Sequence, residues 1–225
     1  MTIEPIAYFH SPFLSKFGVP RQSGLVEQLR GQIVFEPEYR NPDALRGLED
    51  YDYLWIVWGF SANVEAAKHP TVRPPRLGGN RQMGVFATRS PFRPNNIGMS
   101  SARILGIEHG GNDGPVINVA GADLMNGTPI YDIKPYITFT DSHEGARSGI
   151  VDVEKWQKLQ VVMPEELRGK MSAEDMEALI GTLEQDPRPQ YQDDNERIYG
   201  MPFGMYDVRF GVSNGVLRVV DMVDL

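Results

Sequence analysis

The stretch YLWIVWGF, residues 53–60, is the longest apolar run in the chain and the strongest single indication of its fold. It is far shorter than the roughly 20 apolar residues that a membrane-spanning helix needs. Its short length and its aromatic and β-branched residues favour a buried strand. We therefore expect Trp55 and Trp58 to be core residues of this strand and not stacking platforms for a ligand.

Similar short segments lie on both sides of this run. Each carries β-branched or aromatic residues between turn formers, at residues 3–9, 31–37, 83–89, 102–108 and 116–121. One helix is expected among them, beginning at Asn41-Pro42 and ending at Gly47. Many short strands joined by brief turns predict an antiparallel sheet closed into a β-barrel.

The sequence changes in character after about residue 151. A capping-box-like start at residues 172–175 precedes apolar residues at helical spacing, and Asp186-Pro187 ends this helix. The polar stretch at residues 187–197 predicts an exposed loop. From residue 206, apolar residues alternate with polar residues or Gly, and the Asn214-Gly215 pair then predicts a hairpin whose second strand covers residues 216–223. We expect a β-rich α+β protein, with a barrel domain over residues 1–150 and a small α+β domain over residues 151–225.

Composition excludes several kinds of site. The chain has 225 residues, a formal net charge of −8 and no cysteine, so disulfides, thiolate metal sites and a cysteine nucleophile are excluded. Its four histidines are far apart in sequence and show no metal-binding spacing, so we expect no metal. The first residues lack the basic and apolar regions of a signal peptide, and the expectation is a soluble, cytoplasmic protein.

The acidic charge is unevenly distributed. Residues 1–150 hold 14 basic and 15 acidic side chains, whereas residues 151–225 hold 8 and 15. No acidic residue lies between Glu65 and Glu108, and the cations in that window are Lys68, Arg73, Arg76, Arg81, Arg89, Arg93 and Arg103. This basic window indicates either a phosphate-binding surface or a solvated surface whose partners come from elsewhere in the fold.

Two stretches carry candidate chemistry. In GVFATRSPFRPNNIGMSSARI, residues 84–104, Pro91 and Pro94 stiffen a loop that presents Arg89 and Arg93. Paired guanidinium groups suit a carboxylate or a phosphate, and the alternative is a structural Arg–Asp network at the barrel rim. In GADLMNGTPIYDIKPY, residues 121–136, alternation places the side chains of residues 132, 134 and 136 on one face of a short strand. These three are either reactive groups or a cross-strand salt-bridge set.

Five segments of the chain together resemble one enzyme family. They are KFGVPRQSGL (16–25), GLEDYDYLWIVWGF (47–60), RPPRLGGNRQMGVFATRSPFRPNNIGMS (73–100), DLMNGTPIYDIKPY (123–136) and QDPRPQY (185–191). The chain is similar to the bacterial and archaeal tRNA N6-threonylcarbamoyladenosine methyltransferases, and the last segment matches the bacterial subgroup. The resemblance implies a β-barrel catalytic domain that binds S-adenosylmethionine (SAM), a homodimer with SAM near the subunit interface, and methyl transfer to N6 of threonylcarbamoyladenosine at position 37 of tRNA. The product would be S-adenosylhomocysteine.

The resemblance also implies which residues hold the cofactor. These are Ser23, Gly24, Leu25, Phe60, Ser61, Arg89, Met99, Gly121, Ala122, Asp123 and Leu124. The chain differs from the family at three places, since Ser61 and Tyr53 stand where His is common and Asn126 stands where Asp is usual.

Methyl transfer from a sulfonium is an in-line displacement, which positioning and water exclusion accelerate. N6 of the modified adenosine is a poor nucleophile, so we expect Asp132 or Tyr136, helped by Lys134, to accept or orient its proton. Arg93, and after it Arg81, is expected to meet the threonine carboxylate of the substrate.

Further substrate contacts are expected from Asn95 and, in the tail loop, from Arg188 and Tyr191, for which simple domain packing is the alternative. Two other functions remain open at this point. One is a non-catalytic RNA- or nucleotide-binding barrel, and the other is a SAM-dependent methyltransferase acting on a small molecule.

Overall fold

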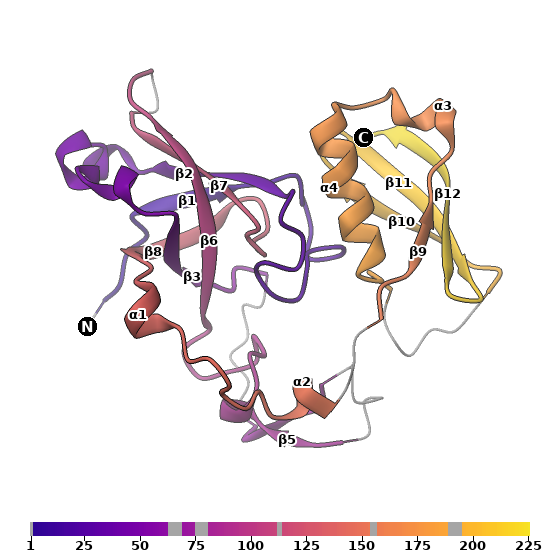
Figure 1. Ribbon diagram of the computed structural model, residues 1–225, viewed down its shortest axis with the longest axis horizontal. Helices are drawn as coiled ribbons and strands as arrows, with labels where there is room; N and C mark the ends of the chain where they lie inside the picture. The colour runs from indigo at the N-terminus through magenta and orange to yellow at the C-terminus, as the bar shows by residue number, and fades with distance from the viewer. Residues whose placement is uncertain (1, 63–68, 75–80, 112–113, 154–156, 189–194) are drawn as a thin grey trace.

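The computed structural model describes residues 2–62, 69–74, 81–111, 114–153, 157–188 and 195–225. Figure 1 shows a barrel, drawn in indigo to magenta, beside a smaller lobe drawn in orange to yellow. Within the described residues, no helix has the length and apolar character needed to cross a membrane.

Six strands close the barrel, and every neighbouring pair is antiparallel. In barrel order they are β1 (Ala7–His10), β2 (Arg30–Phe35), β7 (Val116–Ala120), β6 (Ile97–Glu108), β3 (Tyr53–Gly59) and β8 (Thr128–Pro135). Closure pairs the first strand with the last and leaves no free sheet edge. The predicted antiparallel barrel is confirmed.

Alternation along the strands fills the barrel with side chains. In β3, Leu54 and Ile56 are fully buried and Trp58 is 8% exposed, whereas Trp55 lies on the outer face and is half-buried. The expectation that both tryptophans are core residues is therefore wrong for Trp55. Two residues three positions apart in a strand point to opposite faces of the sheet. The Trp55 indole Nε1 instead donates a hydrogen bond to Asp141 Oδ2 at 2.8 Å.

The segment predicted as a strand over residues 83–89 is mostly not one. It forms only β5 (Met83–Gly84), which pairs with β4 (Thr71–Val72), and then a 3₁₀ turn at Val85–Ala87. Phe86 in this turn is 79% exposed, so the apolar residues here do not share a buried face.

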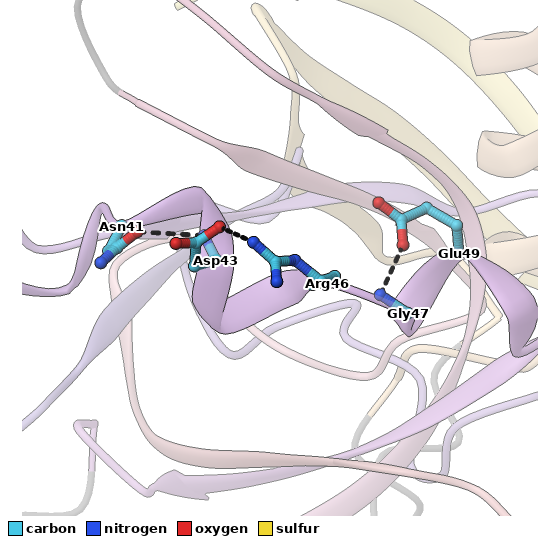
Figure 2. A network of polar contacts seen from close by, with 5 residues as sticks. All are labelled: Asn41, Asp43, Arg46, Gly47 and Glu49. Atoms are coloured by element: carbon cyan, nitrogen blue, oxygen red, sulfur yellow. Dashed lines mark hydrogen bonds and ion pairs between the residues drawn. The ribbon is translucent and has the colours of Figure 1, made fainter.

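The helix predicted from Asn41 is a 3₁₀ turn over Pro42–Leu45 (Figure 2). The Asn41 side chain caps it by accepting a hydrogen bond from the Asp43 backbone N–H at 3.0 Å, and Arg46 pairs with Asp43. Gly47, at φ +87°, takes the left-handed conformation that favours glycine, and the chain turns there.

A second sheet forms the C-terminal lobe. Its order is β10 (Ile198–Phe203), β11 (Tyr206–Ser213), β12 (Val216–Asp224) and β9 (Gln160–Val162), with β9 parallel to β12. The predicted hairpin is β11–β12, and Asn214 and Gly215 both have positive φ, as its tight turn requires. Sequence reasoning missed β9 and β10, along with the short helices α1 (Thr138–Asp141), α2 (Ile150–Val153) and α3 (Glu165–Arg168).

The predicted amphipathic helix is α4 (Ala173–Glu184), which begins after Ser172. The Ser172 hydroxyl accepts a hydrogen bond from the Asp175 backbone N–H at 3.1 Å, which satisfies one of the free N–H groups of the first turn. Figure 1 shows α4 along the side of the second sheet that faces the barrel.

The N-terminal part of the chain contributes to the core of the C-terminal lobe. Phe13, Val26 and Leu29, which precede β2, belong to the same apolar cluster as the buried residues of α4, β10, β11 and β12. An ideal Cβ at Gly18 would lie 2.3 Å from Met201 Sδ, so this loop approaches β10 closely. Residues 13–29 therefore join the barrel to the lobe.

Candidate active site

A cavity of about 510 Å³ opens at the end of the barrel where β3 finishes and β6 and β8 begin. This volume suits a small-molecule ligand. Four parts of the chain line it: the loop before β2, the loop after β5 that carries Arg89 and Arg93 (the arginine loop), the loop between β7 and β8, and the ends of β3, β6 and β8. The lining residues are Lys16, Val19, Pro20, Arg21, Gln22, Trp58, Phe60, Ser61, Ala62, Thr88, Arg89, Pro91, Arg93, Ile97, Gly98, Met99, Ser100, Asp123, Met125 and Thr128.

Two aromatic rings form one wall of the cavity. The Trp58 and Phe60 ring centroids lie 4.3 Å apart at an interplanar angle of 62°, an edge-to-face arrangement. An ideal Cβ at Gly98 would lie 2.4 Å from Trp58 Cε2, so the indole occupies space that only glycine leaves free. Such faces can stack against a nucleobase or attract a cationic group.

A chain of hydrogen bonds connects this wall to a carboxylate. Trp58 Nε1 donates to Ser100 Oγ at 3.0 Å, and Ser100 Oγ donates to Asp123 Oδ1 at 2.5 Å. Burial raises the pKa of Asp123, while the Ser100 hydrogen bond and the positive charge of Arg89 act in the opposite direction. Among the described lining residues, Asp123 carries the only acidic side chain.

The arginine loop is held rigidly by its own polar groups. Arg93 Nη1 donates to the carbonyl oxygens of Thr88 at 3.0 Å and Ser90 at 3.4 Å, and the Thr88 hydroxyl donates to the Val85 carbonyl at 2.9 Å. Arg89 donates to the Gln22 side-chain oxygen of the opposite wall. Neither Arg89 nor Arg93 forms an ion pair with a described residue. Within the described residues, this loop therefore shows no ion-paired Arg–Asp network, which was the alternative interpretation.

The opposite wall adds two more cations, Lys16 and Arg21. Burial lowers the pKa of Arg21, and the neighbouring charge of Asp186 in the C-terminal lobe partly offsets this. The described lining residues thus include four cations and one carboxylate, which favours ligands that carry anionic groups.

The structure brings five of the expected cofactor residues into this cavity: Phe60, Ser61, Arg89, Met99 and Asp123. The other six lie close by in sequence and do not line it. The Gly24 backbone N–H donates to the Gly121 carbonyl at 2.8 Å, which holds residues 23–25 against residues 121–124, while Ala122 and Leu124 are buried in the barrel core.

The three expected catalytic residues lie elsewhere, outside the described cavity lining. Lys134 Nζ forms an ion pair with Asp132 Oδ2 at 2.8 Å, and both side chains are well exposed. The Tyr136 ring packs against Trp55, with centroids 5.4 Å apart, and against Tyr53 at 6.2 Å. Asp132 and Lys134 both lie on β8, so this ion pair runs along one strand and is not the expected cross-strand salt bridge. The catalytic role stays a prediction.

Of the expected substrate residues, Arg93 lines the cavity, while Arg81 and Asn95 are exposed and are not among its lining residues. Arg188 is held in a half-buried, two-point ion pair with Asp186, at 2.8 and 2.9 Å. Tyr191 lies outside the described residues, as do Lys68 and Arg76 of the basic window.

Sequence reasoning missed Lys16, Arg21, Gln22 and Ser100 as lining residues and assigned Trp58 to the core alone. The first three lie in the KFGVPRQSGL segment, whose two cations beside the expected cofactor residues were the available signal. No local pattern marks Ser100, because its position depends on the pairing of β6 with β3.

The donor set of the cavity fits SAM. A guanidinium at Arg89 suits its carboxylate, and the Trp58 and Phe60 faces suit its adenine and its positively charged sulfonium. The Asp123 carboxylate accepts hydrogen bonds from Ser100 Oγ and from the backbone N–H groups of Ser23 and Asp123.

Comparisons with known proteins identify one family. The family model described as the tRNA-methyltransferase O (TrmO) N-terminal domain matches residues 8–142, and the model of the TrmO C-terminal domain matches residues 156–225. An Escherichia coli protein named tRNA (adenine(37)-N6)-methyltransferase is 37% identical over 96% of this chain and 95% of its own.

A Pseudomonas aeruginosa protein named putative S-adenosylmethionine-dependent methyltransferase RcsF is also 37% identical, over 98% of this chain and 97% of its own. The crystal structure of TrmO from the same species superposes with a TM-score of 0.80 at 31% sequence identity, covering 99% of this chain and 98% of that one. The chain therefore belongs to the TrmO family of SAM-dependent tRNA (adenine37-N6)-methyltransferases.

Proposed function

We propose that the adenosine this enzyme methylates is threonylcarbamoyladenosine, so that the product is its N6-methyl derivative at position 37 of tRNA. The supporting observation is Arg93, a half-buried cation of the cavity that forms no ion pair with a described residue. An unmodified adenine carries no anionic group, whereas the threonine of the modified base ends in a carboxylate. A guanidinium binds a carboxylate through two parallel hydrogen bonds.

The Arg93 side chain is already oriented before any substrate arrives. Its contacts with the Thr88 and Ser90 carbonyl oxygens all run through one nitrogen, Nη1. A guanidinium has five N–H donors, so the other nitrogens remain as donors for a ligand. Holding the side chain in place reduces the entropy lost on binding.

When bound, SAM supplies an electrophilic methyl group on a sulfonium. Trp58 and Phe60 offer an apolar wall that excludes water from the reacting groups, and Arg89, held by Gln22, is placed for the SAM carboxylate. Positioning two reactants in such a site lowers the barrier of an in-line displacement without any covalent intermediate on the protein.

A homodimer and a cytoplasmic location belong to the same proposal. Large apolar side chains are exposed beside the cavity and on the outer face of the barrel, among them Phe86, Phe92, Met99 and Leu105. Such a surface is typical of an interface between subunits. A tRNA substrate implies a compartment that contains tRNA.

The test compares anticodon stem–loops that differ only at adenosine 37. Three RNAs are used: one with threonylcarbamoyladenosine, one with its threonine carboxylate converted to an amide, and one with unmodified adenosine. The wild-type enzyme should prefer the first, and Arg93→Ala should lose roughly 10- to 150-fold in kcat/KM on it, as removal of a hydrogen bond to a charged group does.

The matched control is Arg218→Ala, an exposed arginine on β12 that does not line the cavity, and it should leave all three rates unchanged. Equal methylation of the modified and unmodified RNAs would overturn the proposed substrate. Equal loss for Arg93→Ala on all three RNAs would overturn the role of Arg93.

A further inference from the structure

We propose that Asp123 is the catalytic residue that accepts the N6 proton of adenosine during methyl transfer, with Ser100 and Trp58 as its positioning residues. The inference rests on methyl transfer to N6, which the family carries out, and it holds whether or not the threonylcarbamoyl group is present. Any N6-methylation of adenosine or its derivatives must remove one proton from N6.

Asp123 meets the geometric requirements of this role. Its carboxylate lies in the cavity with the arginine loop and the aromatic wall, where the adenosine and the methyl donor must come together. The Ser100 hydroxyl engages Oδ1 at 2.5 Å, within the short range of a charge-assisted hydrogen bond. Ser100 is in turn held by Trp58 Nε1, and the backbone N–H of Ser23 also hydrogen-bonds to the carboxylate, so its orientation in the cavity is fixed.

The step balances as a single displacement. N6 uses its electron pair to form the new bond to the methyl carbon, and the carbon–sulfur bond breaks with its pair remaining on sulfur. The N6–H bond breaks as its proton passes to the Asp123 carboxylate, and that electron pair stays on N6. The step neutralises the negative carboxylate and the positive sulfonium together, which a partly buried cavity favours over two separated charges.

The electrostatics of the site are consistent with a base that works near neutral pH. Burial raises the pKa of Asp123 toward the operating pH, where a general base is most effective. The groups that oppose this rise are the Ser100 hydroxyl, Arg89, the Ser23 backbone N–H and the backbone N–H of Asp123 itself. Lys16, Arg21 and Arg93 are the other charged groups described in the cavity lining.

Asp132, the other candidate acceptor, has a different setting. It pairs with Val57 on β3 and is bound to Lys134 at 2.8 Å, in an exposed ion pair outside the described cavity lining. The Asp132 carboxylate is thus already engaged by a cation and lies apart from the residues that line the cavity. The two candidates can therefore be separated by the same isosteric substitution at each position.

The experiment measures single-turnover methyl transfer at saturating SAM and RNA for Asp123→Asn, Asp132→Asn and Asp43→Asn. Asp43 is an exposed residue of the 3₁₀ turn in Figure 2 and serves as the matched control. Each enzyme is assayed from pH 5 to 9 on the modified and unmodified stem–loops. SAM affinity is measured separately by calorimetry, and the carboxyl carbon of Asp123 is titrated by NMR in the enzyme without SAM.

We expect Asp123→Asn to lower the single-turnover rate at least 100-fold on every RNA that the enzyme accepts, and to lower SAM affinity far less than it lowers the rate. The variant should keep the wild-type preference among the RNAs. Whether threonylcarbamoyladenosine is the substrate is therefore judged from the wild-type enzyme alone. Asp43→Asn should match the wild type. In the wild type, the rate should fall on the acid side of the profile as Asp123 becomes protonated in the complex with its substrates.

Ser100→Ala provides a second test, the pH dependence of the rate, which would not shift if Ser100 and Asp123 had only a structural role. Loss of its hydrogen bond removes one influence that lowers the Asp123 pKa, so the acid limb and the NMR titration should both shift to higher pH. An Asp123→Asn rate within tenfold of the wild type would overturn the proposal, as would a loss of SAM affinity as large as the loss of rate. An unmoved acid limb in Ser100→Ala would also overturn it.

Discussion

The contact between the barrel and the C-terminal lobe predicts a large effect for Asp186→Asn. Asp186 forms a two-point ion pair with Arg188, with side-chain exposures of 18% and 14%, and its charge also acts on half-buried Arg21 of the cavity wall. Asp186 has φ +50°, a left-handed conformation that Asn also tolerates. The substitution therefore removes the charge without straining the backbone.

The size of the effect follows from this burial. Breaking a buried ion pair by removing one partner costs about 3–5 kcal/mol, because the other charge is left uncompensated. The Asn side chain still accepts one hydrogen bond from Arg188, and this lowers the expected loss to about 2–3 kcal/mol of unfolding free energy. The wall formed by residues 16–21 should loosen as well, so we also expect weaker SAM binding.

Urea denaturation followed by circular dichroism measures the loss, with Asp207→Asn as the control. Asp207 pairs with Arg209 at 3.4 Å, with exposures of 28% and 48%, so its loss should cost under about 1 kcal/mol. In a double-mutant cycle with Arg188→Gln, the coupling energy between the two substitutions should account for most of the loss of unfolding free energy caused by Asp186→Asn. The reasoning is refuted if Asp186→Asn costs no more than Asp207→Asn.

Three further predictions concern the site and the helix. Gly98→Ala places a methyl group against the Trp58 indole and should cost about 1–3 kcal/mol while weakening SAM binding; an unchanged melting temperature and SAM affinity would contradict this. Ser172→Ala removes the cap of α4 and should cost about 1 kcal/mol in urea denaturation, whereas no loss would show that the cap is dispensable. The pKa of Asp123 is raised in the folded protein, so the protonated side chain favours the folded state. This contribution to stability is complete below the unfolded pKa and is lost as pH rises through the folded pKa. Thermal unfolding should show Asp123→Asn more stable than the wild type at pH 8, with the gap closing toward pH 4, and the reverse order would contradict the sign.

The elements that the sequence predicts correctly are those with a local physical signature. A short apolar run of aromatic and β-branched residues identifies β3, period-two alternation identifies β11, and the Asn214-Gly215 pair identifies the turn between β11 and β12. The helix predicted from Asn41 has its cap and its stop, but the segment between them is too short for an α-helix and forms a 3₁₀ turn of four residues, Pro42–Leu45. The short strands β9 and β10 depend on lobe pairing, which no local pattern encodes.

The candidate site could be predicted where its residues lie in unusual loops. The arginine loop identifies Arg89 and Arg93, because closely spaced Ser-Pro and Arg-Pro steps are a strong local signal. The connection among Trp58, Ser100 and Asp123 spans three segments and depends on barrel pairing, in which Trp58 pairs with Gly98. The role of Asp123 in the cavity therefore becomes visible only once the barrel is closed.

The charge of the chain is compatible with a tRNA substrate because the charges that matter are local. Electrostatic attraction between exposed groups falls off over about 8–10 Å in physiological salt, so an approaching phosphate responds to the nearest side chains. Around the cavity these include Lys16, Arg21, Arg89 and Arg93 against one carboxylate, Asp123, whereas the acidic excess lies in residues 151–225. Asp186 of that acidic lobe pairs with Arg188 and also acts on Arg21, so its negative charge offsets the cavity cations only at that wall. The acidic lobe should thus repel RNA over most of its surface, and the cationic cavity should attract the target nucleotide.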